Sequence, residues 1–340
     1  MANDSPSIPG FQVYRKLGGG SFGNVWAAIW TRGASLCFVA IKVPNSATRA
    51  DPALMKEFAE EGATLLDLHH PNIVQVYATG RGHGDISFIA MELTKASLKQ
   101  HVQNKGLITL SGLDRCKMCQ GIAAGMKYLE EKRLVHRDLA ARNVLVAENG
   151  QCKIADFGMT RRMVQPNSGC ASYYYDVNGY AYVAGNPEGA IPVLWSAPEV
   201  LSGRRCTSKS DVWSFGVLIW EVMSSGATPY ESPQQIPGFS AAAPSIRTLQ
   251  TYLAHGVRLL KPTGCRDNVY ALMKDAWAYE PAWRPSFSTI LERLQGIIRG
   301  WYQQPSALAL SLQPRVPMIR GSALAYPKLV GSTVNRYRPY

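Results

Sequence analysis

Five residues have the types and spacing needed to transfer a phosphoryl group. Asp138, Arg142 and Asn143 lie in the segment HRDLAARN, Asp156 opens the tripeptide DFG, and Lys42 ends the strand-like segment VAIK. Phosphoryl transfer needs a carboxylate that orients the incoming hydroxyl and accepts its proton, oxygen ligands for a metal ion, and positive charge near the transferred group. Asp138 can supply the first, Asn143 and Asp156 the second, and Lys42 and Arg142 the third. Hard oxygen ligands favour Mg²⁺.

A glycine cluster precedes these residues. Gly18, Gly20 and Gly23 fit the pattern G-x-G-x-x-G-x-V, in which the missing side chains let backbone N–H groups approach phosphate oxygens. Taken alone, such a cluster also marks ordinary hairpin turns. Strand-like runs flank the cluster on both sides, which disfavours a dinucleotide-binding unit because a helix would follow the glycines there.

Lys42 needs an anionic partner if it lies in a phosphate site rather than on a solvated strand. We expect Glu61 to be this partner, because on the helix predicted over 51–68 it shares a face with Leu65. Glu57 and Glu60 lie on the same predicted helix and are the other candidates for the partner of Lys42. We expect both to face solvent.

Periodicity predicts an α+β chain with a small β-rich lobe, one helix in that lobe, and a larger, mainly helical lobe. Asp51 is a predicted N-cap with Pro52 at the first helical position. The elements that follow are strands at 73–77 and 88–92 and helices at about 112–132, 210–223, 246–256, 268–278 and 286–299. We expect a cleft between the two lobes.

Taken together and in this order, HRDLAARN, DFG, VAIK and the glycine loop resemble the eukaryotic protein kinases, particularly the protein tyrosine kinase group of receptor-type and related non-receptor catalytic domains. The resemblance covers roughly residues 11–300. It implies the two-lobed protein kinase fold, with an N-lobe at about 11–93 and a C-lobe at about 97–300, and ATP and Mg²⁺ as cofactors. Residues 301–340 are predicted to form a disordered basic tail.

The resemblance also assigns roles residue by residue. The catalytic set would be Asp138, Arg142, Lys42 and Glu61, and the metal ligands Asn143 and Asp156. The nucleotide would contact Leu17, Gly18, Gly20, Gly23, Val25, Ala40, Lys42, Met91, Glu92, Thr94 and Leu145. Met91 would be the gatekeeper, and Glu92 and Thr94 would offer backbone hydrogen bonds. Glu199 of the APE motif would pair with Arg284, and Asp211 would anchor the catalytic loop.

Two positions favour tyrosine as the substrate residue. Ala140 stands where serine/threonine kinases usually have lysine, and Arg142 follows Asp138 by four positions, as in tyrosine kinases. The segment with Trp195 also resembles their peptide-binding loop, although Leu194 and Ser196 depart from the usual residues. The alternatives are a serine/threonine or dual-specificity kinase, and a kinase-like binding module without turnover, which would typically lack Lys42, Asp138 or Asp156.

The activation segment, residues 156–199, contains a group of tyrosines: Tyr173, Tyr174, Tyr175, Tyr180 and Tyr182. Arg137 can pair with a phosphate there and order the segment. We expect autophosphorylation, with Tyr174 or Tyr175 favoured. For any single tyrosine, a plain surface position in an insertion is the alternative.

Bulk properties leave the remaining assignments open. The net charge is +12, and residues 301–340 contain five basic residues and no acidic one, but no segment resembles a nucleic-acid-binding module. No apolar run reaches transmembrane length.

The seven cysteines, including the pair Cys116 and Cys119, are expected to be reduced thiols. We expect a cytoplasmic location, or the cytoplasmic side of a membrane if the chain is part of a receptor.

The tail offers two motifs for protein partners beyond tyrosine-bearing substrates. Residues 314–317, PRVP, have the spacing of an SH3 ligand. Tyr302, Tyr326, Tyr337 and Tyr340 would be SH2 docking sites once phosphorylated. A tail without function is the alternative.

Overall fold

The computed structural model describes residues 6–20, 23–81, 87–163, 173–175, 181–183, 191–203, 205–236 and 245–303. The chain divides into two compact units, residues 1–301 and 302–340, and the packing described below belongs to the first. The predicted tail motifs at 314–317 and at Tyr326, Tyr337 and Tyr340 lie outside the described residues.

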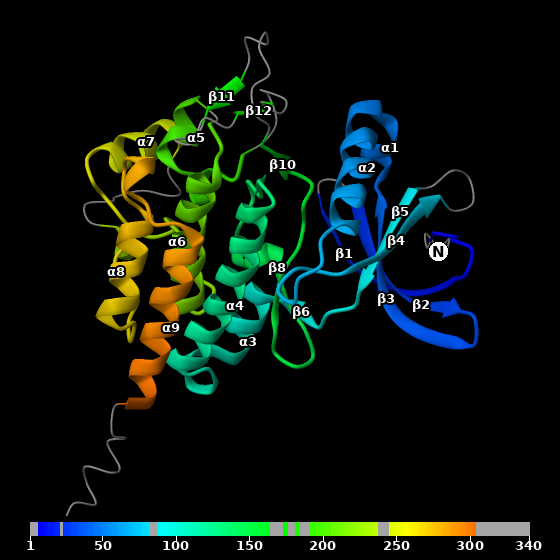
Figure 1. The fold of residues 1–340 in the computed structure, drawn as a ribbon, viewed down its shortest axis with the longest axis horizontal. Helices are drawn as coiled ribbons and strands as arrows, with labels where there is room; N and C mark the ends of the chain where they lie inside the picture. Colours follow the sequence, from blue (N-terminus) through cyan, green and yellow to red (C-terminus); the bar gives the residue numbers. More distant parts are fainter. Residues whose placement is uncertain are drawn as a thin grey trace, which may run out of the picture. The chain divides into compact units, whose positions relative to one another are not determined.

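A five-stranded antiparallel sheet forms most of the N-lobe (Figure 1). Its strands are β1 (Phe11–Gly19), β2 (Gly23–Arg32), β3 (Ser35–Pro44), β4 (Val76–Arg81) and β5 (Ser87–Glu92). The spatial order is β1-β2-β3-β5-β4, so β3, which carries Lys42, lies in the centre. This central position pairs β3 on both sides and gives Lys42 a fixed backbone.

Two helices, rather than the predicted one, accompany the sheet. Helix α2 (Pro52–Leu66) begins where expected, because the Asp51 side chain accepts a hydrogen bond from Ala53 N at 2.8 Å. The additional helix, α1 (Ser46–Ala50), has five residues. Asn45 caps it by accepting from Thr48 N at 2.8 Å, an N-cap that the sequence interpretation overlooked.

The strand predicted at 73–77 was placed too early. Ile73 instead forms a parallel bridge with Ile154 of the C-lobe. Val74 N donates to Ile154 O at 2.8 Å, and Ile154 N donates to Asn72 O at 2.9 Å. Residues 72–74 therefore pair with the C-lobe, and β4 begins only at Val76.

The C-lobe is mainly helical, which confirms the predicted α+β architecture. Its helices are α3 (Leu98–Thr109), α4 (Gly112–Glu131), α5 (Pro198–Gly203), α6 (Ser208–Met223), α7 (Ile246–Ala254), α8 (Asp267–Ala276) and α9 (Phe287–Gln303). The sequence pattern predicted α4 and α6 to α9 to within a few residues. Helices α3 and α5 were not delimited, because α3 has a non-helical residue, Gly106, inside it and α5 is only six residues long.

Short strands and turns lie between the helices. One small sheet joins β6 (Ala96–Ser97), β8 (Val144–Val146) and β9 (Cys152–Ile154), and two-stranded pairs join β7 (Leu134–Val135) to β10 (Arg161–Arg162) and β11 (Tyr173–Tyr175) to β12 (Ala181–Val183). Single 3₁₀ turns occur at η2 (Ala141–Asn143), η3 (Val193–Trp195), η4 (Pro233–Gln235) and η5 (Pro281–Trp283). These turns and strands carry most of the predicted site.

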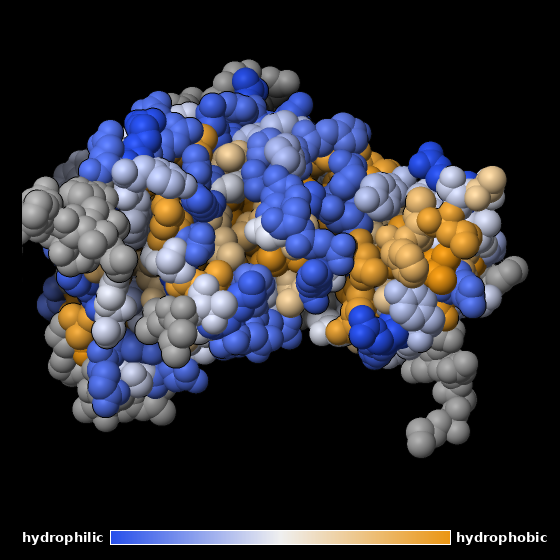
Figure 2. All heavy atoms as spheres, turned by 90° about the horizontal axis from the view of Figure 1, so that it is seen from below, coloured by the Kyte–Doolittle hydropathy of each residue, from blue (hydrophilic) through white to orange (hydrophobic). Residues whose placement is uncertain are grey.

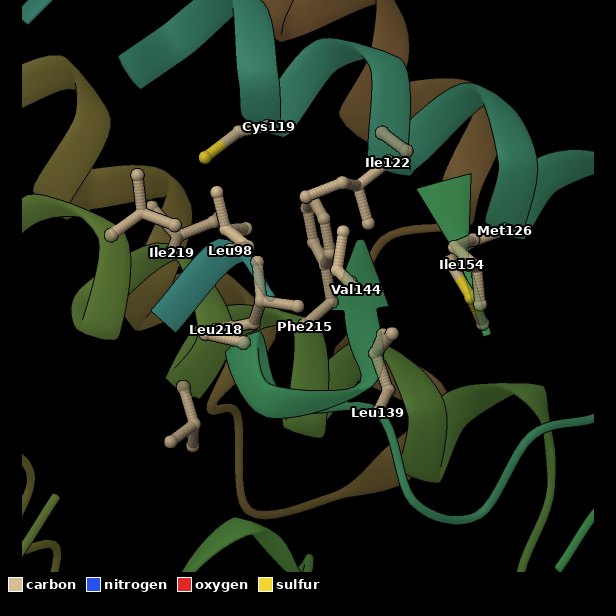
Figure 3. Packing of buried hydrophobic residues seen from close by; sticks show 14 of the residues in the cluster. Leu98, Cys119, Ile122, Met126, Leu139, Val144, Ile154, Phe215, Leu218 and Ile219 are labelled. Carbon is tan, nitrogen blue, oxygen red and sulfur yellow. The ribbon is translucent and has the colours of Figure 1, made fainter. Parts of the chain in front are cut away.

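The main core supports the predicted catalytic loop directly. Leu139 of that loop and Val144 of β8 are fully buried in the same cluster as Phe215 and Leu218 of α6 and Ile122 of α4 (Figure 3). Since close-packed side chains tolerate little movement, the backbone on both sides of Arg142 and Asn143 has a rigid support.

None of the six described cysteines forms a disulfide, and five of the six are buried. Burial raises the pKa of the Cys116 and Cys152 thiols to about 12, which leaves these thiols protonated and unreactive at neutral pH. No helix in the described part of the chain is long and apolar enough to cross a bilayer.

The close contact between α4 and residues 72–74 yields a stability prediction. A Cβ added at Gly125 would lie 2.8 Å from Asn72 O and 2.8 Å from Ile154 Cδ1. We expect Gly125→Ala to lower the free energy of unfolding by about 1–3 kcal/mol, measured by urea denaturation. Gly300→Ala in α9 is the control, because nothing lies within 4 Å of its Cβ and alanine favours helices by up to ~1 kcal/mol. Equal destabilisation by both substitutions would contradict the prediction.

Candidate functional site

Lys42 and Glu61 form a buried ion pair, as the sequence predicted. The Lys42 Nζ atom lies 2.7 Å from Glu61 Oε1 and 2.8 Å from Oε2, joining strand β3 to helix α2. It also lies 3.4 Å from Asp156 Oδ1. Burial by itself would lower the pKa of Lys42, but the carboxylates of Glu61 and Asp156 outweigh it and raise the pKa above its ordinary value. Lys42 therefore stays protonated at neutral pH.

The two competing glutamates differ in their surroundings. Glu60 is exposed and pairs with Lys56 of the preceding turn, at 3.9 Å, as expected for a solvated residue. Glu57 was predicted to face solvent, and this was wrong. Its Oε1 lies 3.2 Å from Arg161 Nη2, because β10, at the start of the activation segment, runs close to α2. Arg161 was not singled out from the sequence.

Asp138 is held at both carboxylate oxygens. Arg142 Nη2 donates to Asp138 Oδ1, and Asn143 Nδ2 donates to Asp138 Oδ2 and to its backbone oxygen, each at 2.7 Å. The 3₁₀ turn η2 (Ala141–Asn143) makes these contacts possible, because it folds the two donors back toward Asp138. Burial raises the pKa of Asp138, and the Arg142 guanidinium opposes this. The structure thus brings together three of the predicted residues.

Asp211 anchors the backbone that precedes Asp138. Its carboxylate, fully buried on α6, accepts hydrogen bonds from His136 N at 2.7 Å and from Arg137 N at 2.9 Å. Arg137 has a φ of 70°, a left-handed conformation that a non-glycine residue adopts at an energetic cost. The two hydrogen bonds offset this cost, and the expected anchoring contact is present.

Asn143 and Asp156 offer the oxygen atoms that a hard divalent cation prefers. Since Asn143 Nδ2 is engaged by Asp138, the amide oxygen is the atom left for a ligand. Ala155 N donates to Asn143 O at 2.9 Å, which keeps the residue before Asp156 next to Asn143. In the described residues, no group of three or more His, Cys, Asp or Glu could hold a metal ion by itself. Two oxygen ligands fit a Mg²⁺ ion that shares its coordination with nucleotide phosphates.

The glycine loop is a tight turn between β1 and β2. Gly20 N donates to Gly23 O at 2.8 Å, and Asn45 Nδ2 donates to Gly20 O at 3.2 Å. A Cβ at Gly23 would lie only 2.4 Å from Val43 O, so a larger residue would push β2 away from β3. Gly18 pairs with Val25 across the turn. The loop tip, residues 21–22, lies outside the described residues.

Four of the predicted adenine contacts belong to one apolar cluster or pack against it, whereas Leu17 is exposed. Ala40 pairs with Met91 across β3 and β5, and Val25 pairs with Lys42 across β2 and β3. Val25 and Leu145 of β8 both pack against the cluster that contains Ala40 and Met91. The sheet and the C-lobe thus both contribute apolar side chains to this cluster, the kind of side chain that a flat base requires.

The surface of the sheet is also apolar in places. Figure 2 shows apolar colour gathered at the sheet end of one face, whereas the helical end of that face is mainly hydrophilic. The large exposed apolar residues of the sheet are Tyr14, Leu17, Leu36, Phe38 and Tyr77. Phe38, 66% exposed, lies on the same side of β3 as Ala40 and Lys42, so the apolar face next to Lys42 continues outward along the strand.

The two predicted hinge residues are less alike than expected. Glu92 N already donates to Gln75 O at 2.9 Å, and the Glu92 side chain accepts from Gln75 N at 2.8 Å and pairs with Lys153 Nζ at 2.9 Å. The Glu92 N–H is therefore already engaged, and a base would bond to the Glu92 carbonyl. Thr94 is half-buried in the connection between β5 and β6.

The end of the activation segment is fixed to the C-lobe. Arg284, with a fully buried side chain, donates to both oxygens of Glu199 at 2.6 and 2.8 Å, as expected from the sequence. Trp195 of η3 lies under Arg142, whose guanidinium carbon is 4.4 Å from the ring centroid. This contact joins the predicted peptide-binding segment to the catalytic loop, and the sequence did not reveal it.

The activation-segment tyrosines fall partly on a hairpin. Tyr174 of β11 pairs with Tyr182 of β12, and Tyr173 pairs with Val183. Only the backbone of these strands is described, and Tyr180 lies outside the described residues. The expectation of autophosphorylation at Tyr174 or Tyr175 therefore stays a prediction.

Comparisons with known proteins agree with this geometry. Residues 11–294 match the family described as protein tyrosine and serine/threonine kinase. The chain is 35% identical over 303 residues to Tyrosine-protein kinase SRK3 of Spongilla lacustris. This match covers 87% of this chain and 80% of SRK3. It is 35% identical over 282 residues to Tyrosine-protein kinase Abl of Drosophila melanogaster and 32% identical over 284 residues to Tyrosine-protein kinase FRK of Homo sapiens.

The last two matches involve only part of the longer relatives. They cover 82% and 84% of this chain, but the chain spans 15% of Abl and 50% of FRK.

The buried Asp211 carboxylate predicts a distinct pH dependence of stability. Burial raises the pKa of Asp211 to about 6, from an ordinary value of 3.8. Between pH 3.8 and about pH 6 the Asp211 carboxyl is protonated in the folded protein and ionised in the unfolded chain. The protonated carboxyl therefore contributes most to stability in acid, and this contribution is lost as the pH rises toward 6. A shift of about two units corresponds to about 3 kcal/mol.

Asp211→Asn removes this titration. We therefore expect the difference in unfolding free energy between wild type and Asp211→Asn to fall by about 2 kcal/mol from about pH 4 to about pH 7, measured by urea denaturation. A difference that is constant or rises with pH would contradict the assignment.

Proposed function

Because the chain belongs to the protein tyrosine and serine/threonine kinase family, in its tyrosine-kinase group, we propose that the whole protein transfers the γ-phosphoryl group of ATP to tyrosine hydroxyls in other proteins. The observation that carries this proposal is the joint geometry of Lys42, Glu61 and Asp138. The Lys42–Glu61 pair is closed at 2.7 Å, and Asp138 is held by Arg142 and Asn143. Both features are needed at once for transfer.

In this mechanism Asp138 orients the incoming tyrosine hydroxyl and accepts its proton at a carboxylate oxygen. Arg142 and Asn143 keep that carboxylate in one rotamer, so the hydroxyl meets a fixed acceptor. The position of Asp138, largely buried and 17% exposed at its side chain, limits competition from water.

Lys42 binds and orients the nucleotide phosphates. Its ammonium group, held by Glu61, supplies a fixed positive charge toward which the phosphates are drawn. Val25, Ala40 and Leu145 would enclose the base, with Met91 behind it.

The family uses ATP and a divalent metal ion in general, and we propose Mg²⁺ as the ion here. Asn143 and Asp156 would hold it through their side-chain oxygens. When bound, the ion would neutralise charge on the phosphates. Asp156 has a φ of 60°, and this strained conformation turns its carboxylate toward Lys42, at 3.4 Å.

Tyrosine specificity is supported by the relatives, all named tyrosine-protein kinases, and by the contact between Arg142 and Trp195. A lysine at position 140 would characterise the serine/threonine class, and Ala140 is there instead. The presence of Lys42, Asp138, Asn143 and Asp156 argues against a kinase-like module without turnover. The proposed catalytic domain comprises residues 11–300.

Location and tail partners rest on the sequence alone. A cytoplasmic location, the SH3-ligand spacing at 314–317 and the tail tyrosines as SH2 docking sites stay predictions.

The first activity prediction concerns Asp138. We expect Asp138→Asn to lower phosphorylation of an acidic tyrosine-containing copolymer by Mg²⁺-ATP by about 10²–10⁴-fold, because the proton acceptor is lost, while nucleotide binding persists. Asp267→Asn is the matched control, because the Asp267 side chain is 93% exposed on α8, and it should leave the rate unchanged. Full activity of Asp138→Asn would refute the role of Asp138. Serine and threonine peptides in the same assay separate the kinase classes.

The second activity prediction concerns self-modification. After incubation with ATP, mass spectrometry of the wild type should find phosphate on Tyr174 or Tyr175, and the Asp138→Asn protein should lack it. Phosphate at these sites can pair with Arg137 and order the segment. Unmodified peptides across residues 172–183 in an active preparation would defeat this prediction.

A further inference from the structure

A fully buried carboxylate, Glu221 of α6, lies beneath the catalytic loop. Its Oε2 accepts hydrogen bonds from Ala141 N and from Trp195 Nε1, each at 2.9 Å. Its Oε1 is buried without a hydrogen-bond partner in the described part of the chain. No ion pair among the described residues includes Glu221, so its two donors are both uncharged.

Such a group is costly to keep. A buried carboxylate without an ion-pair partner loses its hydration, and the charges of Arg142 and Lys99 compensate for this loss only in part. Accordingly, burial raises the pKa of Glu221. An apolar residue of similar size would avoid this desolvation cost, but it would leave Ala141 N and Trp195 Nε1 without their acceptor. Its two hydrogen bonds are the feature that an apolar residue cannot supply.

Both hydrogen bonds lead to Arg142. Ala141 immediately precedes Arg142 in the turn η2, so the first hydrogen bond fixes the backbone from which the Arg142 side chain starts. The second fixes the indole of Trp195, and the Arg142 guanidinium lies over this ring at 4.4 Å. Glu221 therefore holds the start and the end of a long side chain that has many rotamers.

Arg142 in turn contacts Asp138. Its side chain is 37% exposed, so solvent offers it alternative conformations, and only the ring of Trp195 and the Asp138 carboxylate oppose them. The backbone of the segment Val193–Trp195 has a separate attachment to α6, because Ser214 Oγ donates to Trp195 O at 2.9 Å. The indole orientation can therefore be altered without releasing the segment.

We propose that Glu221 is a positioning residue for phosphoryl transfer, which fixes Arg142 against Asp138 and couples the segment that receives the peptide to the catalytic carboxylate. This inference rests on the proposed function. Glu221 touches no reacting atom in this scheme. Its effect passes through Ala141 and Trp195, which belong to the C-lobe, whereas Lys42 and Glu61 belong to the N-lobe. Loss of Glu221 should therefore impair turnover with tyrosine peptides and leave nucleotide binding unchanged.

The test compares two residues of similar length at this position. In Glu221→Gln the amide oxygen can accept both hydrogen bonds, whereas Glu221→Met has no acceptor. We expect Glu221→Met to lower kcat for a tyrosine peptide at least tenfold, and up to ~100-fold, as misplaced catalytic groups do. Glu221→Gln should stay within about threefold of wild type, and both should bind nucleotide with unchanged Kd. Glu60→Met, at an exposed position of α2, is the control and should change nothing.

A second variant keeps the inference testable if Glu221→Met does not fold. Trp195→Phe retains an aromatic ring for Arg142 but removes the indole N–H. We expect a loss of kcat of about three- to tenfold, again without a change in nucleotide Kd.

The outcomes separate this inference from the proposed function. An active wild type together with a folded, fully active Glu221→Met protein overturns the inference alone. Equal impairment of Glu221→Gln and Glu221→Met also overturns it, because charge rather than hydrogen bonding would then matter, as does full activity of Trp195→Phe. A wild type that binds nucleotide but phosphorylates no tyrosine substrate refutes the proposed function and this inference with it.

Discussion

The functional loops of this kinase depend on hydrogen bonds from one buried helix. Nearly every side chain of α6 is buried, and three of its polar residues, Asp211, Ser214 and Glu221, bind to loop segments. Their spacing of three and seven residues places them on one side of the helix. The apolar residues between them pack into the core, so a rigid element carries both the hydrophobic support and the polar contacts of the loops.

A second constraint connects the lobes at the phosphate-binding position. Lys42 is fixed from the N-lobe by its strand and by Glu61, and it reaches Asp156 of the C-lobe. Lys42 and Glu61 are buried and charged, so each needs the other as a partner, whereas the Asp156 side chain is partly exposed. The position of Lys42 thus depends on its contacts with both Glu61 and Asp156. Glu57 and Arg161 extend this set to the beginning of the activation segment.

Much of this arrangement could be predicted from the sequence, for identifiable physical reasons. Long helices such as α4 and α6 have clear caps and apolar periodicity, and the helix phase selected Glu61 over its two neighbours. Two features of the fold could not be predicted from the sequence, for equally specific reasons. Helix α1 depends on a single Asn45 cap, and the true start of β4 depends on a bridge between Ile73 and Ile154 that no local pattern encodes.

In the site, too, some features could be predicted from the sequence and others could not. The chemical residues Asp138, Asn143 and Asp156 were identified by motif, because phosphoryl transfer demands those side chains in that order. The contacts of Trp195 with Arg142, of Glu57 with Arg161 and of Glu221 with Ala141 join residues far apart in the chain. They depend on how the helices pack, so single-sequence patterns do not reveal them.

The bridge between residues 72–74 and β9 has a mechanical consequence. Because Asn72 and Val74 are hydrogen-bonded to Ile154, this short stretch must travel with the helical lobe whenever the two lobes rotate. The sheet and α2 would then swing about this stretch and the β5–β6 connection. Lys42 and Glu61 would move together in such a swing, and their separation from Asp156 would be the distance that opens and closes.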